Sequence, residues 1–88
     1  SNMKIEVNKI ITLGNKEKYL VVTGVTHNNN NYYYIAECND NEDDIKDNYK
    51  IVKEVCEDGR TYINEVVGES NLKTVLPLFV NKIVNIKE

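Results

Sequence analysis

A stripe of apolar residues near the C-terminus limits the choice of fold. The spacing of one helix face recurs at Leu72, Val75, Leu76, Phe79, Val80, Ile83 and Val84. This pattern is typical of an amphipathic helix that buries one side. Gly68 ends the preceding segment and Ser70 is a residue type that caps helices, so we expect the helix to begin there. Pro77 lies inside the stripe and predicts either a kinked helix or the start of a second one.

The chain before this stripe consists of β-favouring runs separated by turn signals. A short strand or lead-in is expected at 8–13, with a turn at Gly14-Asn15. Further strands are expected at 17–26, 32–38, 49–57 and 61–67. Asp58-Gly59 is the strongest short hairpin signal. Because asparagine tolerates positive φ, the four asparagines at 28–31 predict a second tight turn, flanked by His27.

Successive side chains of a strand point to opposite faces of a sheet. Along 17–26, one face is expected to collect Tyr19, Val21, Thr23 and Val25. Gly24 in this run indicates a bulge or a close packing partner. Along 49–57, the more apolar set is expected to face the core and comprises Tyr49, Ile51, Lys53 and Val55.

The chain of 88 residues is expected to form a single small domain at 3–88. Ser1 and Asn2 before Met3 have the character of an expression-tag remnant. Sequential strands with short links and one terminal helix predict an α+β fold. We expect an antiparallel β-meander of four to five strands with one C-terminal amphipathic helix packed on one face.

The charge and hydropathy of the sequence disfavour two classes of partner, nucleic acids and membranes. The net charge is −3, and the acidic residues concentrate between Glu37 and Asp47, which disfavours a nucleic-acid partner. Arg60 is the single arginine beside ten lysines, so bidentate phosphate contacts are scarce. The sequence contains no apolar run of about 18 residues and no secretory signal. We therefore expect a cytoplasmic protein that does not bind membranes.

Residues for metal binding or catalysis are few and scattered. The soft metal ligands are His27, Cys38 and Cys56, whereas structural zinc sites need four ligands, supplied mostly as close pairs. The two cysteines are expected near opposite ends of an antiparallel strand pair, too far apart for a disulfide. No nucleophile, base and orienting group can be assembled around one histidine, and the glycines are isolated. We expect no enzymatic activity and no cofactor.

The acidic segment 39–48 has some of the features of a calcium loop. Asp40, Glu42 and Asp44 alternate as oxygen ligands would. The EF-hand pattern then fails, because Ile45 stands where it needs glycine and Ile51 where it needs glutamate. A solvated loop is the better interpretation. A divalent-ion or small-ligand site in this loop, with or without enzymatic activity, is the alternative function.

The tyrosines of the run at 32–38 offer a candidate interaction surface. Alternation places Tyr33 and Ile35 on one face and Tyr32, Tyr34 and Ala36 on the other. Tyrosines on a small sheet are more often half-buried core. If Tyr32 and Tyr34 lie away from the helix, however, they would form an exposed aromatic patch for a protein partner or a homodimer.

The succession of these segments resembles one known family. It comprises "KYLVVTGVTHNNNNYYYIAECND", an acidic spacer, "YKIVKEV", the turn "CEDGRTYINEV" and the terminal amphipathic segment. Over 13–83 this order is similar to the YrzB-like family of small acidic bacterial proteins, a domain of unknown function found mainly in Firmicutes. The resemblance implies two successive strands, an acidic loop, another strand, a hairpin and a closing helix. It implies no activity and no site residue.

These observations predict a small, non-enzymatic protein-interaction module. Its expected surface includes Tyr32 and Tyr34, and its expected partner is an unknown protein or a second copy of the chain.

Overall fold

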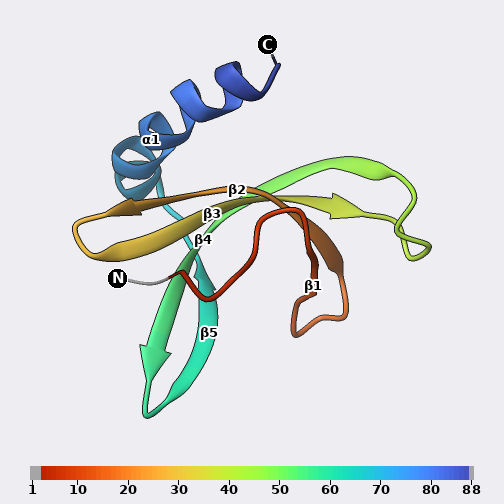
Figure 1. Cartoon of the computed structure of the whole chain (residues 1–88), viewed down its shortest axis with the longest axis horizontal. Helices are drawn as coiled ribbons and strands as arrows, with labels where there is room; N and C mark the ends of the chain where they lie inside the picture. Colours follow the sequence, from red (N-terminus) through yellow and green to blue (C-terminus); the bar gives the residue numbers. More distant parts are fainter. Residues whose placement is uncertain (1–2, 88) are drawn as a thin grey trace.

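A computed structural model describes residues 3–87, with side chains described for 3–80 and 82. The strands form one antiparallel sheet in the order β1-β2-β3-β4-β5 (Figure 1). Their bounds are Ile10–Thr12 (β1), Lys18–His27 (β2), Asn30–Cys38 (β3), Ile45–Glu57 (β4) and Arg60–Glu65 (β5), and one helix, α1, spans Glu69–Lys87. The predicted α+β meander with a C-terminal helix is confirmed.

Two hairpin turns follow from residues that adopt positive φ. Asn28 and Asn29 have φ of 51° and 64° between the paired residues His27 and Asn30. The other turn places Asp58 and Gly59 at φ of 53° and 78° between the last pair of β4 and β5. Positive φ at both central residues matches the twist of the flanking strands. Both predicted turns are confirmed.

A bulge in β2 changes which side chains share a face. Val21 lies opposite Ile35, but Thr23 lies opposite Tyr34, so the register shifts across Val22. Ile35 and Tyr34 leave β3 on opposite faces, and their partners on β2 do the same. The expectation that Tyr19, Val21, Thr23 and Val25 share one face is therefore wrong, because the extra residue at Val22 reverses the alternation midway.

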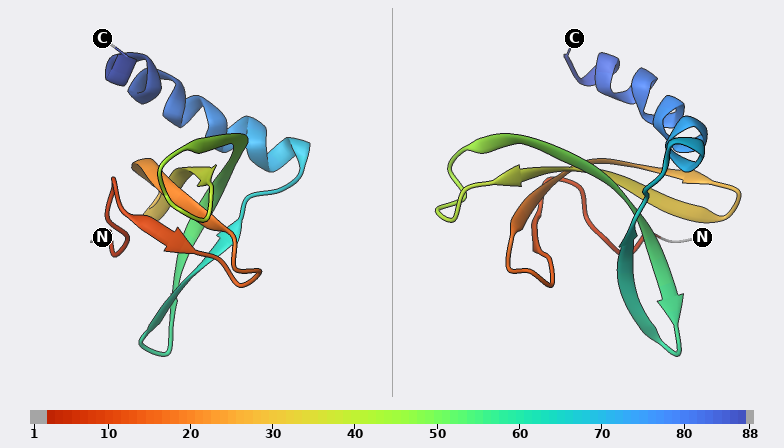
Figure 2. Two further views of the ribbon diagram at one scale, coloured as in Figure 1. Left: turned by 90° about the vertical axis from the view of Figure 1, so that its right-hand side faces the viewer. Right: turned by 180° about the vertical axis from the view of Figure 1, so that it is seen from behind.

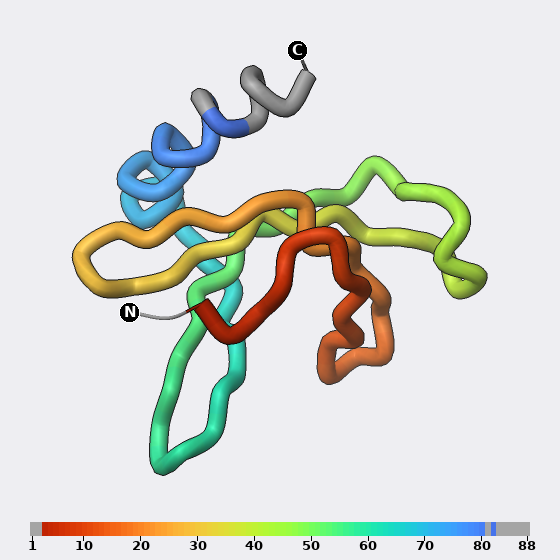
Figure 3. Tube along the Cα trace, viewed as in Figure 1, coloured from red at the N-terminus to blue at the C-terminus, as the bar shows by residue number. Residues whose placement is uncertain are grey.

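The chain before β1 crosses the face of the sheet opposite α1 (Figure 3). We call residues 3–9 the strap and this side of the sheet the strap face. The strap is fixed by hydrogen bonds from Lys4 N to Glu54 Oε1 at 3.0 Å and from Asn8 N to Val21 O at 2.7 Å. A Cβ atom at Gly24 would lie 2.5 Å from Met3 Cε and 3.0 Å from the Tyr33 ring, so Gly24 permits a close approach of the strap.

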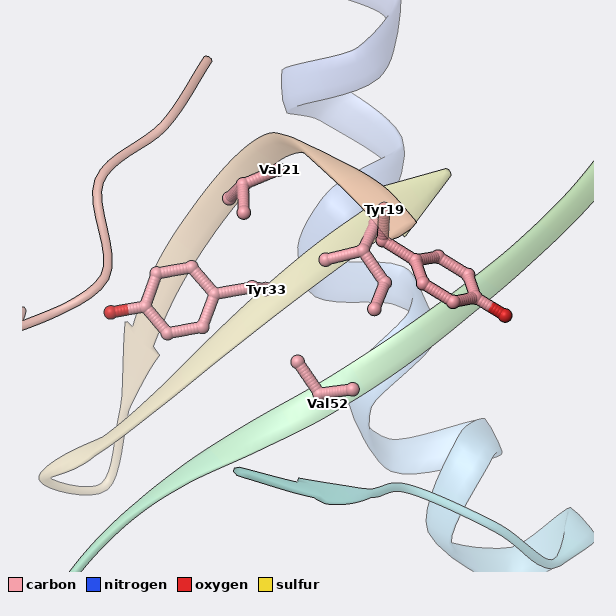
Figure 4. Packing of buried hydrophobic residues seen from close by; sticks show 5 residues of the cluster. Tyr19, Val21, Tyr33 and Val52 are labelled. Carbon is pink, nitrogen blue, oxygen red and sulfur yellow. The ribbon is translucent and has the colours of Figure 1, made fainter. Parts of the chain in front are cut away.

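The strap face carries the first of two hydrophobic cores. Figure 4 shows how side chains from three strands meet there. The fully buried members are Tyr19, Val21, Tyr33, Ile35 and Val52, and Ile5, Ile11, Leu13 and Ile63 pack around them. Burying each such side chain contributes about 1.5–3 kcal/mol. This core joins the strap to the sheet, including its edge strand β5.

The second core lies between the sheet and α1, on the side that we call the helix face. Ile51, Val75 and Phe79 are buried there, surrounded by Val25, Tyr32, Tyr34, Val66, Leu72 and Leu78. Both faces of β4 are thus apolar at its centre, since Val52 is buried on the strap face. Ile51 faces a core as expected, whereas Tyr49 of the same set is 47% exposed, because α1 does not cover that end of the sheet. The sheet is covered on two sides, so no single set faces the core.

Helix α1 is continuous through Pro77, which excludes a second helix starting there. It begins at Glu69 rather than at Ser70, and the amide of Leu72 donates to Gly68 O at 3.0 Å. Lys82 Nζ also donates to Gly24 O at 2.5 Å and ties the helix to β2. Of the predicted apolar stripe, Val75 and Phe79 are buried, Leu76 and Val80 are exposed, and Ile83 and Val84 lie outside the described side chains.

The acidic loop is shorter than the sequence indicates. Strand β4 begins at Ile45, which pairs with Cys38, so only residues 39–44 connect the strands. Backbone pairing with β3 overrides the polar composition of residues 45–48.

The asparagine turn supplies a test of the hairpin. Asn29→Ala should lower the free energy of unfolding by about 1–2 kcal/mol, because a Cβ residue without a short polar side chain is strained at positive φ. Asn29→Gly should maintain or raise it. Urea unfolding would measure both, with Asn41→Ala in the exposed acidic loop as the control. Equal stability of the alanine and glycine variants would contradict the positive-φ turn.

Candidate functional site

The two tyrosines predicted to form an interaction surface lie on the helix face. Tyr32 and Tyr34 are half-buried and pack against the core that α1 covers. The condition for an exposed patch, that they lie away from the helix, is not met. Their rings support α1, so replacing either of them would disturb the fold as well as any surface.

The exposed aromatic residue of this region is Tyr49, which the alternation along 49–57 places in the set expected to face the core. Its ring stacks on Tyr34 with centroids 5.6 Å apart and planes 7° apart, while Tyr34 also meets Phe79 at 6.1 Å. Burial, followed by the neighbouring Tyr49 and Asp47, raises the pKa of the Tyr34 hydroxyl. Tyr49 itself is 47% exposed, so one face of the pair is available to a partner.

A groove runs between α1 and β4 beside this pair, with a volume of about 300 Å³. We call it the tyrosine groove; its apolar lining comprises Tyr34, Tyr49, Ile51, Val66, Leu72 and Leu76. Leu76 is 46% exposed, and Val80, one turn further along α1, is 52% exposed. These residues are the part of the helical stripe that does not reach the sheet. The groove is therefore an apolar surface assembled from two elements.

Beyond α1, the helix face continues as an apolar row across four strands. Ile10 lies opposite Leu20, Leu20 opposite Ala36, and Ala36 opposite Tyr49. At the loop end of this row is a hollow of about 340 Å³, the acidic hollow, lined by Ile10, Leu20, Cys38, Glu42, Asp43, Asp44 and Ile45. Ile45 is 46% exposed. Tyr49 thus joins the tyrosine groove to the apolar row that ends in the acidic hollow.

The acidic loop is organised by its own hydrogen bonds. Asn39 Oδ1 accepts from the amides of Asp43 and Asp44 at 3.1 and 3.3 Å. Lys18 Nζ binds Glu42 Oε2 and Asp40 O, each at 3.0 Å. Among the residues that the structure describes, no three His, Cys, Asp or Glu side chains gather closely enough to hold a metal ion.

A buried carboxylate lies on the strap face, at a position that no pattern in the sequence indicates. Glu54 is 8% exposed and accepts from Tyr33 Oη at 2.6 Å, Lys4 N at 3.0 Å and Asn31 Nδ2 at 3.1 Å. Burial acts to raise the pKa of Glu54, but these donors outweigh it, and the pKa is lowered. Burial likewise raises the pKa of Tyr33. This cluster connects the strap to β3 and β4.

A cleft of about 460 Å³ lies on the strap face between β1 and β5. These two strands form the edges of the curled sheet, and both edges bend away from α1 (Figure 2). The apolar lining of the cleft includes Ile5, Ile11, Leu13, Val52 and Ile63. Lys50 and Glu65, paired at 3.2 Å, are also in its wall. Hydrogen bonding to Glu65, opposed by burial, raises the pKa of Lys50. The cleft is therefore a mainly apolar hollow whose wall contains one ion pair.

The remaining candidate residues do not come together. His27 ends β2 beside its turn, Cys38 is buried at the end of β3, and Cys56 is exposed near the end of β4. Both cysteines are free. Within residues 3–87, no helix is long and apolar enough to cross a membrane. Comparison with known proteins finds no matching family model, no matching curated protein and no matching solved structure.

The Glu54 cluster predicts a pH dependence of stability. Because the pKa of Glu54 is lower in the folded chain than its ordinary value of 4.5, the folded state binds fewer protons. Its contribution is present above pH 4.5 and is lost as the pH falls through the folded pKa. Glu54→Gln should reduce the free energy of unfolding at neutral pH by about 1–3 kcal/mol and flatten its decline in acid.

Urea unfolding between about pH 5 and pH 3 would measure this decline, since that interval spans the ordinary glutamate range. Glu57→Gln, a matched change at the exposed end of β4, should leave the decline as in the wild type. Some decline persists in both variants because Asn48 and Lys46 also lower the pKa of Glu37. An acid decline of unchanged steepness in Glu54→Gln would contradict the assignment.

Proposed function

We propose that this chain is a small, cytoplasmic, non-enzymatic protein-interaction module that binds through its helix face. The supporting observation is the exposed, stacked ring of Tyr49 beside Leu76 in the tyrosine groove. A rigid aromatic anchor next to an apolar hollow is typical of protein interfaces. The surface also extends along the row to Leu20 and Ile10, so it is larger than one hollow.

Burial decides which tyrosines contribute. Tyr34 lines the groove and Tyr32 packs against the core that α1 covers, whereas Tyr49 presents its ring to solvent. Tyr49 and Leu76 are both nearly half exposed, and substitutions at exposed positions change stability by only about 0.5 kcal/mol. The proposed surface can therefore be altered without unfolding the protein.

The proposal predicts that peptides selected on this protein depend on Tyr49 and Leu76. A random peptide library displayed on phage would be selected on the wild type, and the recovered peptides would be measured by fluorescence anisotropy. Tyr49→Ser/Leu76→Ser should weaken their binding at least tenfold, as expected for loss of a central anchor. Light scattering after size exclusion would show whether the same variant changes self-association.

A matched control is available outside the tyrosine groove. Tyr62→Ser/Val7→Ser also removes one tyrosine and one aliphatic side chain, and both wild-type residues are exposed, Tyr62 by 42%. This variant should bind the selected peptides as the wild type does. Peptides that lose affinity only for the control variant would place the site outside the tyrosine groove and contradict the proposal.

The rival proposal is a divalent-ion or small-ligand domain that uses the acidic loop. Calcium and magnesium titrations, followed by the NMR amide shifts of Asp40 to Asp47, separate the two. We expect no saturable shift at millimolar ion, because no three acidic side chains of the described residues gather closely enough to hold an ion, and Lys18 Nζ already binds Glu42 Oε2 and the backbone oxygen of Asp40. Saturable shifts confined to this loop would favour the rival.

A further inference from the structure

The acidic hollow combines an apolar floor with a charged wall. Ile10, Leu20 and Ile45 line it together with Cys38, which is buried. Glu42, Asp43 and Asp44 come from the loop at its side. An apolar floor lowers the local dielectric, so a cation that reaches these carboxylates interacts with them more strongly than it would in open water.

The carboxylates of this wall differ in their partners. Glu42 is paired with Lys18, whose pKa its hydrogen bond raises. Asp43 and Asp44 instead engage Asn39 and the Ile45 amide and form no ion pair with a cation of the described residues. Their negative charge therefore remains available beside the exposed Ile45 side chain.

Negative charge also borders the other end of the row. Asp47 lies close enough to Tyr34 to contribute to its raised pKa, and Tyr34 stacks on Tyr49. A cationic side chain placed over the Tyr49 ring would gain both the charge of Asp47 and the attraction of the ring face. The apolar row thus runs between two places that favour positive charge.

We propose that the partner of the helix face is a basic amphipathic segment of another protein. Its apolar side chains would enter the acidic hollow and cover the row up to Tyr49, and its lysine or arginine side chains would face Asp43, Asp44 and Asp47. The charge complementarity of the apolar surface and its acidic border identifies this occupant. The inference rests on the proposed function of the helix face and adds the chemistry of the partner.

Three short synthetic peptides test this inference. The first carries leucine and lysine at helical spacing, the second replaces each lysine by glutamate, and the third replaces each leucine by glycine. We expect the leucine-lysine peptide to bind at least tenfold more tightly than the other two. Its NMR shifts should lie at the amides of Ile10, Leu20, Ile45 and Tyr49.

Matched charge variants complete the test. Asp43→Asn/Asp44→Asn should weaken the leucine-lysine peptide about fivefold, as expected for two exposed ion pairs. Glu57→Gln/Asp58→Asn makes the same change of charge at the β4–β5 turn and should leave binding unchanged. Raising the salt from about 0.05 to 0.5 M should weaken binding further in the wild type than in the Asp43/Asp44 variant.

The outcomes separate this inference from the proposed function. Equal binding of the leucine-lysine and leucine-glutamate peptides at the helix face would overturn the basic partner while leaving a protein-binding surface. Binding of the lysine peptides to the strap face, or equal losses in both charge variants, would also overturn the inference. If the selected phage peptides bind the Tyr49→Ser/Leu76→Ser variant as tightly as the wild type, the proposed function itself is contradicted.

Discussion

Both hydrophobic cores depend on the alternation of side chains along β3. Tyr33 and Ile35 enter the core under the strap, while Tyr32 and Tyr34 enter the core under α1. A central strand that is apolar on both faces needs two covers, and the two ends of the chain supply them. The bulge at Val22 moves the side chains that follow it in β2 to the other face of the sheet. Thr23 and Val25 therefore lie on the same face as their partners Tyr34 and Tyr32 in β3.

Local chemistry made much of this fold predictable, and long-range pairing decided the rest. The turns at Asn28-Asn29 and Asp58-Gly59 could be predicted because positive φ is a property of the residues themselves. The bulge could not, because both faces of β2 are apolar and alternation leaves no trace of the shift. Tyr49 was missed as a surface residue because its face follows from pairing across β3, and Glu54 because its partner Lys4 lies 50 residues away.

The position of α1 explains why part of the helix face stays exposed. The amide of Val66 donates to Ile51 O at 2.8 Å, which fixes the chain beside the middle of β4 just before the helix begins. From there α1 covers the end of the sheet near Val25 and Tyr32 and leaves the row at Leu20 and Tyr49 uncovered. The apolar surface and its acidic border thus stay exposed because the chain leaves β5 beside the middle of β4, and α1 begins there.

The strap also sets an order in which the protein can be completed during its synthesis. The ribosome releases Lys4 early, but its acceptor Glu54 emerges 50 residues later. The β2–β3 hairpin closes over a two-residue turn and can pair as soon as it leaves the exit tunnel. The core around Tyr33 therefore lacks Val52 and Glu54 until β4 has been made. A nascent chain stalled before residue 52 would present the uncovered part of this apolar face to chaperones.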